Sequence, residues 1–390
     1  MSHDPIIAAF FLIFAGAAVV ATIALFARQA LLIAYILIGA LLGPWGLGFV
    51  DDPVLIQQIA HIGIIFLLFL IGLNLQPQEL LHLMRKTTVV TLISSVLFAL
   101  AGGVVALAFG YSLLDAIVVG AAMSFSSTIV GLKLLPTTIL HHQRTGEVII
   151  SILLLQDLLA IGVLMALQGA DQSTELAWLD VFRLMLGPPA MIALAWVMQR
   201  FILLPLFRRF DKIQEYIFLM AIAWCLSLAQ LADYLGLSSE IGAFIAGVTL
   251  ASSPISLFIA ESLKPLRDFF LVIFFFSLGA GFDLSMIHVV LLPAVLLAAV
   301  TIVLKPPVFR WLLSRTGETD KRSNEVGFRL GQMSEFSLLI AVLALDSGVI
   351  SESSSYLIQF ATVLTFLVST YVVVMRFPTP IALSDRLRRD

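Results

Sequence analysis

GAAMSFSS, residues 120–127, and LGQMSEFSLL, residues 330–339, are the two stretches that decide the predicted fold. Each places small and hydroxyl side chains inside a long apolar segment, so helix propensity is weak where a membrane span would run. Serine and threonine hydroxyls can satisfy the backbone groups that an interrupted membrane helix frees. We therefore expect a break in the helix at each place. Close packing of an unbroken helix through its small residues is the alternative.

These two stretches form one of three sequence matches that recur in the same order. IGALLGP at 38–44 resembles IGAFIAG at 241–247, and FLLFLIGLNL at 66–75 resembles FFFSLGAGFDL at 274–284. In each pair, the second piece lies the same odd number of predicted membrane spans after the first. An odd number of spans reverses the direction in which the chain crosses, so the second copy is inverted relative to the membrane. Inverted repeats with broken helices near the bilayer midplane are typical of secondary transporters. Chance similarity between apolar segments rich in Gly and Phe is the alternative for any single pair.

The composition is that of an all-α polytopic membrane protein. Hydrophobic residues make up 60% and charged residues 12% of the 390 residues. About thirteen apolar stretches are long enough to cross a hydrocarbon core of ~30 Å as helices. The predicted spans are 5–26, 30–46, 54–74, 87–109, 114–133, 146–168, 182–207, 214–234, 238–253, 265–282, 287–312, 326–346 and 354–376. We expect one transporter domain over residues 1–390, with repeats at about 5–168 and 214–376 and a linker helix at 182–207.

Basic residues are distributed unequally among the predicted loops. All but two of the 22 lysines and arginines lie at or near the ends that follow odd-numbered spans, whereas the other loops are mainly acidic. Positive residues stay on the cytoplasmic side of a membrane. We therefore expect a multi-pass protein of the bacterial inner (plasma) membrane, with the N-terminus outside and the C-terminus in the cytoplasm. Arg386, Arg388 and Arg389 are expected to orient the chain or to anchor it against membrane lipid.

Two charged residues lie inside predicted spans. Asp157 stands within LLLQDLLAIGVLM (153–165), and Lys305 stands within AVTIVLKPPVF (299–309). A charge at the middle of a membrane helix costs about 3 kcal/mol on lenient insertion scales, so it is retained mainly where it faces a partner, a water-filled cavity or a transported ion. The two residues therefore indicate a transporter, with a fixed salt bridge between them as the structural alternative.

The chemistry of a buried carboxylate suits coupled exchange. A bare carboxylate is unfavourable in surroundings of low dielectric constant, so a proton and a metal cation compete for Asp157. Hard monovalent cations prefer oxygen ligands, which can be supplied beside it by Gln156, Ser126, Ser127 and Thr128. The sequence thus predicts a site that binds either a cation or a proton. K+ or Na+ and H+ would be the transported ions, and no cofactor is expected.

Other functional classes lack their sequence signals. The chain has no Walker A loop, zinc-ligand spacing or nucleophile–base arrangement, so neither an ATP-driven pump nor an enzyme is expected, and no nucleic-acid partner is indicated. The single cysteine, Cys225, excludes an internal disulfide. His61 is a candidate pH sensor because imidazole titrates near neutral pH; an ordinary solvated residue at a helix end is the favoured alternative. His141 and His142 lack the further ligands of a metal site.

Several motifs of the sequence together match one known family. The chain resembles the membrane domain of the second monovalent cation:proton antiporter family, especially the Kef-type potassium/proton antiporters, and more distantly the sodium/proton antiporters of the NapA and NhaA type. The resemblance spans about residues 35–340. Its pieces are GPWGL (43–47), LFLIGLNLQP (68–77), SSTIV (126–130), LLQDLLAI (154–161), GAFIAGVTLASSP (242–254), ESLKPLRDFFLVIFFFSLGAG (261–281), Lys305 and LGQMSEFSLL (330–339).

The resemblance implies a fold and a set of roles. It implies a homodimer of thirteen-helix subunits of the NhaA/NapA-like fold, each with a dimerisation domain and a mobile core domain that contains two crossing, discontinuous helices. It implies that Asp157 carries the ion and the proton, and that Gln156 stands where electrogenic sodium antiporters often have a second Asp. Lys305 matches the core lysine. Glu335 matches the acidic residue of the second crossing helix, as charge balance or as an ion contact, while Gln332 beside it is expected to be structural.

Several features depart from the family pattern. His61 and Asn74 stand where the family usually has glutamate, and Arg329 is an additional charge before LGQMSEF. Kef systems also append a cytoplasmic nucleotide-binding domain, which the sequence through Asp390 does not contain. Gating by nucleotide on this polypeptide is therefore not expected, and a separate cytoplasmic regulatory subunit is a candidate partner.

The expected function is exchange of K+ or Na+ for protons by alternating access, as used in pH homeostasis. A gated cation channel and the transmembrane subunit of a two-polypeptide system are the alternatives. Lys305 has two candidate roles: a permanent cation that balances charge, which gives electroneutral exchange, or a titrating amine that pairs with Asp157, which gives electrogenic exchange. Gln156 in place of an acid favours the electroneutral version.

Overall fold

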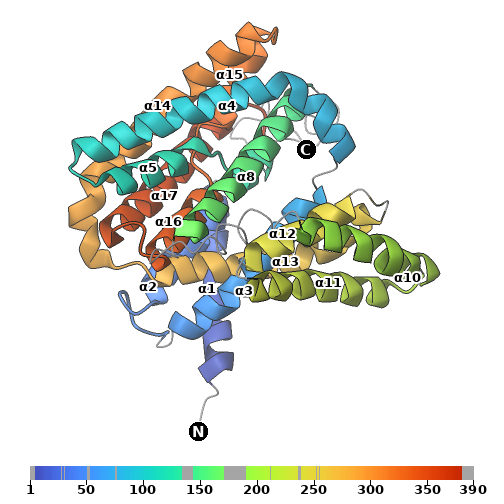
Figure 1. Ribbon diagram of the computed structural model, residues 1–390. Coiled ribbons are helices and arrows are strands. Elements are labelled where there is room, and N and C mark those ends of the chain that lie inside the picture. Colours follow the sequence, from blue (N-terminus) through green and yellow to red (C-terminus); the bar gives the residue numbers. More distant parts are fainter. Residues whose placement is uncertain are drawn as a thin grey trace. The chain divides into compact units, whose positions relative to one another are not determined.

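The computed structural model describes residues 5–27, 29, 31–50, 53–74, 77–133, 144–170, 190–210, 212–235, 239–251, 253 and 255–379. Helices form its regular structure (Figure 1). Their bounds are α1 (Pro5–Phe26), α2 (Leu31–Leu42), α3 (Pro53–Asn74), α4 (Pro77–Ala108), α5 (Leu113–Ser124), α6 (Thr128–Lys133), α8 (Arg144–Ala170), α10 (Leu204–Arg209), α11 (Gln214–Tyr234), α12 (Ser239–Ala251), α13 (Ser256–Ala280), α14 (Ile287–Arg315), α15 (Asp320–Arg329), α16 (Glu335–Asp346) and α17 (Glu352–Arg376).

The prediction of an all-α polytopic membrane protein is confirmed. Within the described ranges, 7 helices are long and apolar enough to cross a membrane by length and composition. Shorter apolar helices accompany them, among them α2 and α5. The predicted linker helix at 182–207 is described only from residue 190 onward, where the chain is helical up to α10.

Two helices begin well before the predicted spans. The span predicted at 87–109 is the second part of α4, which starts at Pro77, and the span predicted at 265–282 is the second part of α13, which starts at Ser256. The added residues include charged and polar side chains such as Glu261 and Lys264. Hydropathy identifies the apolar stretch that crosses a bilayer. It does not identify polar helical turns that precede that stretch, such as the first turns of α4 and α13.

The chain divides into two compact units. The first contains residues Met1–Ala15, Ile38–Leu80 and Gln172–Gly281; the second contains Gly16–Leu37, Leu81–Asp171 and Phe282–Asp390. The division into two inverted repeats is a different partition of the chain and stays a prediction.

In the first unit α3 packs against both α12 and α13. Glycine permits the contact with α12: a Cβ added at Gly247 would collide with the carbonyl oxygen of Phe69, and one added at Gly72 would collide with that of Phe244. The two backbones therefore touch directly. Small residues that allow such an approach are the usual basis of helix association in membranes, where lipid is as apolar as the side chains.

In the second unit α14 packs against α15 and α17, and α16 packs against α5, α8 and α17. Figure 1 shows this group, with α16 beside α17 and α5. The first predicted interruption lies here: α5 ends at Ser124, Phe125–Ser127 are not helical, and α6 starts at Thr128. The second lies between the end of α15 at Arg329 and the start of α16 at Glu335. Both predicted breaks are confirmed.

Side chains cap the helices that restart after each break. The hydroxyl of Ser127 accepts a hydrogen bond from the Val130 N–H at 3.0 Å, at the start of α6. Ser334 and Ser337 form a capping box at the start of α16. Ser337 also donates to the carbonyl oxygen of Ala122 at 2.6 Å, which fastens α16 to α5. The serines that weaken the continuous helix are therefore the residues that stabilise its restarts.

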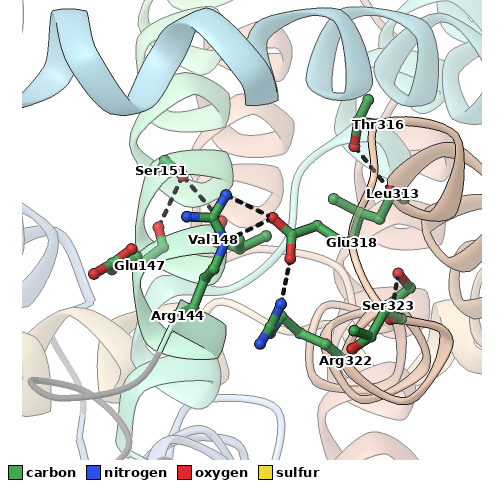
Figure 2. Close-up of polar contacts among 10 residues, drawn as sticks. Arg144, Glu147, Val148, Ser151, Leu313, Thr316, Glu318, Arg322 and Ser323 are labelled. Carbon is green, nitrogen blue, oxygen red and sulfur yellow. Dashed lines mark hydrogen bonds and ion pairs between the residues drawn. The ribbon is translucent and has the colours of Figure 1, made fainter.

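An ionic cluster fixes the start of α8 against the segment between α14 and α15. Figure 2 shows Arg144 and Arg322 reaching the carboxylate of Glu318 from two sides, Arg144 to Oε1 and Arg322 to Oε2. The side chain of Glu318 is 8% exposed. Its burial raises the pKa of the carboxyl, but the hydrogen bonds and charges of Arg322 and Arg144 outweigh burial and hold the pKa below the ordinary value.

Glu318→Gln is expected to lower the free energy of unfolding at neutral pH by about 1–2 kcal/mol. This value lies between the contribution of an exposed ion pair and that of a buried hydrogen bond to a charged group. Folding lowers the pKa of the Glu318 carboxyl, so the ionised group stabilises the folded protein. This stabilisation is fully present above the pKa that the carboxyl has in the unfolded chain, near 4.5. It is lost as the pH falls through the lower pKa of the folded protein. The difference in melting temperature between the wild type and the variant in detergent should therefore be present at pH 7 and shrink below about pH 4.

Asp320→Asn is the matched control, because the pair of Asp320 with Arg310 is largely exposed and such pairs contribute little. An equal loss for both variants, or a Glu318→Gln difference that persists unchanged in acid, would contradict the assigned role of the cluster.

Candidate functional site

Lys305 joins the two breaks. Its Nζ donates to the carbonyl oxygen of Phe125 in the first break at 2.7 Å and to that of Gln332 in the second at 2.9 Å, and lies 3.3 Å from the hydroxyl of Ser126. The residue is fully buried, and Nζ lies 5.3 Å from the centre of the Phe98 ring. Helix interruptions free carbonyl oxygens that carry partial negative charge. The backbone of the two breaks therefore supplies the hydrogen-bond acceptors of the buried Lys305 side chain.

The two breaks also contact one another directly. Ser126 donates from its hydroxyl to the carbonyl oxygen of Leu330 at 2.9 Å. The amide Nε2 of Gln332 points to the carbonyl oxygen of Ser127 at 3.5 Å. The interrupted helices thus meet at their non-helical residues, as the prediction of two crossing discontinuous helices requires.

Asp157 lies on α8 with 2% of its surface exposed. Thr128, the first residue of α6, donates from its hydroxyl to the carboxylate, with both carboxylate oxygens at 3.3 Å. Glu335, the first residue of α16, is buried and acts on Asp157 electrostatically. Like charges in one buried place repel, so the pair is stabilised when a proton or a cation binds there.

Gln156, the neighbour of Asp157, supports the first break. Its Oε1 accepts from the N–H of Ser126 at 3.0 Å, and its Nε2 donates to the carbonyl oxygen of Ser124 at 3.2 Å. One amide thus replaces two hydrogen bonds that the interrupted helix lacks. Of the four predicted oxygen ligands, Thr128 contacts Asp157, whereas Gln156, Ser126 and Ser127 hydrogen-bond the backbone of the breaks.

Lys305 and Asp157 form no ion pair within 4.0 Å in this structure; both residues are described, and the ammonium is bound to the carbonyls instead. The fixed salt bridge considered from the sequence is therefore not the arrangement present. The two hydrogen bonds to carbonyl oxygens can be donated by the amine in either protonation state. The titrating role considered from the sequence pairs Lys305 with Asp157, and that pair is not formed in this structure.

Two residues of the site were missed from the sequence. On α17, Thr365 accepts a hydrogen bond from the Met333 N–H at 3.0 Å, and Ser369 donates to Oε1 of Gln332 at 2.9 Å. A signal for them exists, because α17 carries polar residues that recur every three or four positions in an apolar helix. They are Ser355, Gln359, Thr362, Thr365 and Ser369. Such a stripe marks the face that packs against other helices.

The remaining predicted residues differ in burial and in whether the structure describes them. His61 is exposed on α3, in the first unit. Arg329, the additional charge, is buried at the end of α15, pairs with Glu325 and donates to the carbonyl oxygen of Pro378 at 2.8 Å. The side chain of Asn74 lies outside the described residues. So do His141, His142, Arg386, Arg388 and Arg389.

Comparison with known proteins finds a matching family and several relatives of the chain. The family described as "Sodium/hydrogen exchanger, transmembrane" matches residues 11–376. K(+) efflux antiporter 4 of Arabidopsis thaliana is 32% identical over 382 residues, which cover 93% of this chain and 62% of that protein. Iron transporter MagA of Paramagnetospirillum magneticum is 29% identical over 88% of this chain and 79% of its own length.

The chain thus spans about three fifths of the length of its plant relatives. Among solved structures, the sodium proton antiporter MjNhaP1 from Methanocaldococcus jannaschii at pH 8 matches with a TM-score of 0.70 over 95% of this chain and 96% of that one, at 16% sequence identity. This match shows the shared fold, and the predicted resemblance to cation:proton antiporters is confirmed. The chain belongs to the transmembrane sodium/hydrogen exchanger family.

Proposed function

We propose that the protein exchanges a monovalent cation, K+ or Na+, for protons across a membrane by alternating access. The observation that carries the proposal is the buried carboxylate of Asp157 at the point where two interrupted helices meet, with a hydroxyl ligand from Thr128 and a second carboxylate, Glu335, acting on it. A charge in such a place is rare in membrane helices unless it serves an ion or proton path. The names of the plant relatives, K(+) efflux antiporters, support the same function.

The proposed roles follow from the contacts. Asp157 binds a proton in one half of the cycle and the cation in the other, and Thr128 is the side-chain oxygen ligand that touches it. Glu335 strengthens the attraction for either positive ion. Lys305 is the permanent cation that balances the carboxylates and the freed carbonyls. Since Gln156 is neutral, replacing one proton by one cation leaves the charge of the site unchanged, which favours electroneutral exchange.

The assembly and orientation are part of the proposal. The positive-inside distribution of Lys and Arg supports an external N-terminus and a cytoplasmic C-terminus in the bacterial inner membrane. We infer a homodimer from the family resemblance and a single transporter domain with inverted repeats from the matched segments. A separate cytoplasmic regulatory subunit is a further candidate partner. We favour K+ over Na+ because K+ is the ion in the names of the plant relatives.

Reconstitution in liposomes tests the function. Purified protein is placed in vesicles that contain a pH dye, and Li+, Na+, K+ or Rb+ is added at two pH values. We expect K+ to drive the largest proton movement, with a rate that does not change when a membrane potential is imposed. Protein-free vesicles are the control. Cation currents that persist without any movement of protons would instead support the gated channel.

A further inference from the structure

The helices that follow the two breaks support them in different ways. After the first break, α8 supplies one amide, Gln156, which satisfies both an N–H and a carbonyl oxygen of the interrupted segment. After the second break, α17 occupies the corresponding place in the chain order, and it supplies hydroxyls instead. If the predicted repeat holds, α8 and α17 are its related members, so the same structural need is met by different residues.

Thr365 uses both hydrogen-bonding directions of its hydroxyl. Its Oγ1 accepts from the Met333 N–H at 3.0 Å and donates to the carbonyl oxygen of Thr362, in its own helix, at 2.8 Å. Met333 belongs to the non-helical residues between α15 and α16, where no helical carbonyl is available to its N–H. Both Thr365 and Met333 are fully buried. A buried N–H without an acceptor is costly. The hydroxyl of Thr365 therefore stabilises the position of the non-helical segment that contains Met333.

Ser369 fixes the residue before Met333. Its hydroxyl donates to Oε1 of Gln332 at 2.9 Å, while the backbone carbonyl of Gln332 accepts from the Lys305 ammonium at 2.9 Å. Gln332 is therefore held by α17 through its side chain and by α14 through its backbone. A shift of Gln332 toward or away from α17 would move one of the two carbonyl oxygens that hold Lys305.

We propose that Thr365 and Ser369 are positioning residues that, through Met333 and Gln332, keep the Lys305 ammonium on the carbonyl oxygens of the breaks and away from Asp157. The inference rests on the proposed function. Lys305 and Asp157 share this site, since Ser126 contacts Lys305 and is itself held by Gln156, the neighbour of Asp157. An ammonium released from Gln332 has the Asp157 carboxylate as an alternative acceptor, where it competes with the transported cation.

The test compares Thr365→Val, Ser369→Ala and Thr365→Ser in the vesicle assay. Valine keeps the shape of threonine without the hydroxyl, whereas serine keeps the hydroxyl. Loss of one positioning hydrogen bond is expected to raise the apparent KM for the cation roughly three- to tenfold, with less than about a twofold change in maximal rate per folded protein. Thr365→Ser should return the KM to the wild-type value.

Thr91→Val is the matched control. Thr91 is also fully buried, but its hydroxyl donates only to Thr87 of its own helix, α4, at 3.0 Å, so its KM should equal that of the wild type. If Thr365→Val does not fold, Ser369→Ala and Thr365→Ser carry the comparison. The proposal is overturned if the KM is unchanged in Ser369→Ala and Thr365→Val. It is also overturned if the KM rises in these variants and rises equally in the control, Thr91→Val.

The two proposals fail differently. If wild-type vesicles show no proton movement driven by a cation, the proposed function itself is wrong. If the wild type exchanges ions, Asp157→Asn does not, and the α17 variants keep the wild-type KM, only the positioning role is wrong.

Discussion

Asp157→Asn is expected to abolish cation/proton exchange, with a fall in rate of at least about a hundredfold, or about 2.7 kcal/mol. Asparagine has the shape of aspartate and can still accept a hydrogen bond from Thr128. It carries no negative charge and does not bind a proton at ordinary pH. Since charge interactions are strong in surroundings of low dielectric constant, the loss of that charge removes both the proton site and the main attraction for the cation. Proton movement in dye-loaded vesicles measures the effect.

Asp115→Asn is the control for this experiment. Asp115 is also a buried carboxylate of the second unit, 5% exposed, but it accepts from Ser112 and Ser351, at the starts of α5 and α17. Its substitution should reduce stability and leave the exchange rate of the remaining folded protein close to that of the wild type. Full exchange by Asp157→Asn would remove the role assigned to Asp157.

Lys305→Met is expected to cost about 3 kcal/mol or more of stability and to prevent accumulation of folded protein. Methionine keeps most of the length and volume of lysine but donates no hydrogen bond. The carbonyl oxygens of Phe125 and Gln332 would both lose their ammonium donor, and a lost hydrogen bond to a charged group costs about 1.5–3 kcal/mol. The carboxylates of Asp157 and Glu335 would also lose a compensating positive charge.

The measurement is the melting temperature and the yield of folded protein in detergent. Lys305→Arg, which keeps the charge but brings a wider, planar group, should lie between the wild type and Lys305→Met. A Lys305→Met protein as stable as the wild type would show that the breaks do not depend on this ammonium.

The helix breaks were predictable because they arise from local composition. Ser124, Ser126 and Ser127 lower helix propensity within an apolar span, and the cluster around Ser334 does the same in the matched segment. Hydrogen bonding within the broken segments then uses these same hydroxyls, as the cap of α6 by Ser127 shows. Local sequence therefore contained both the cause of each break and part of its stabilisation.

The partners of the breaks were not predictable in the same way. Gln156 is predicted as a cation ligand from its place beside Asp157, and the structure adds a contact that the sequence did not predict: its amide spans the gap between Ser124 and Ser126. Thr365 and Ser369 belong to the polar stripe of α17, which indicates a packing face but does not indicate which groups their hydroxyls meet. Which backbone group such a side chain meets depends on how two helices pack, and no spacing within one helix reveals it.

The charged pair shows the same limit. Asp157 and Lys305 are costly in a membrane, so the sequence predicts that each has a partner. The sequence does not determine whether they pair with each other. In the structure, Lys305 donates to the carbonyl oxygens of Phe125 and Gln332, and Asp157 accepts from Thr128. The breaks expose these carbonyl oxygens, which an intact helix would have used internally.

Asp157 is proposed to hold a proton and a cation in turn, and proton release on cation binding tests this exchange most directly. K+ is added to weakly buffered, purified protein in detergent, and the protons released are counted with a pH dye. About one proton is expected to be released per bound cation near the pH where Asp157 is protonated, and none from Asp157→Asn. Cation binding by the wild type without proton release, or equal release from both proteins, would contradict it.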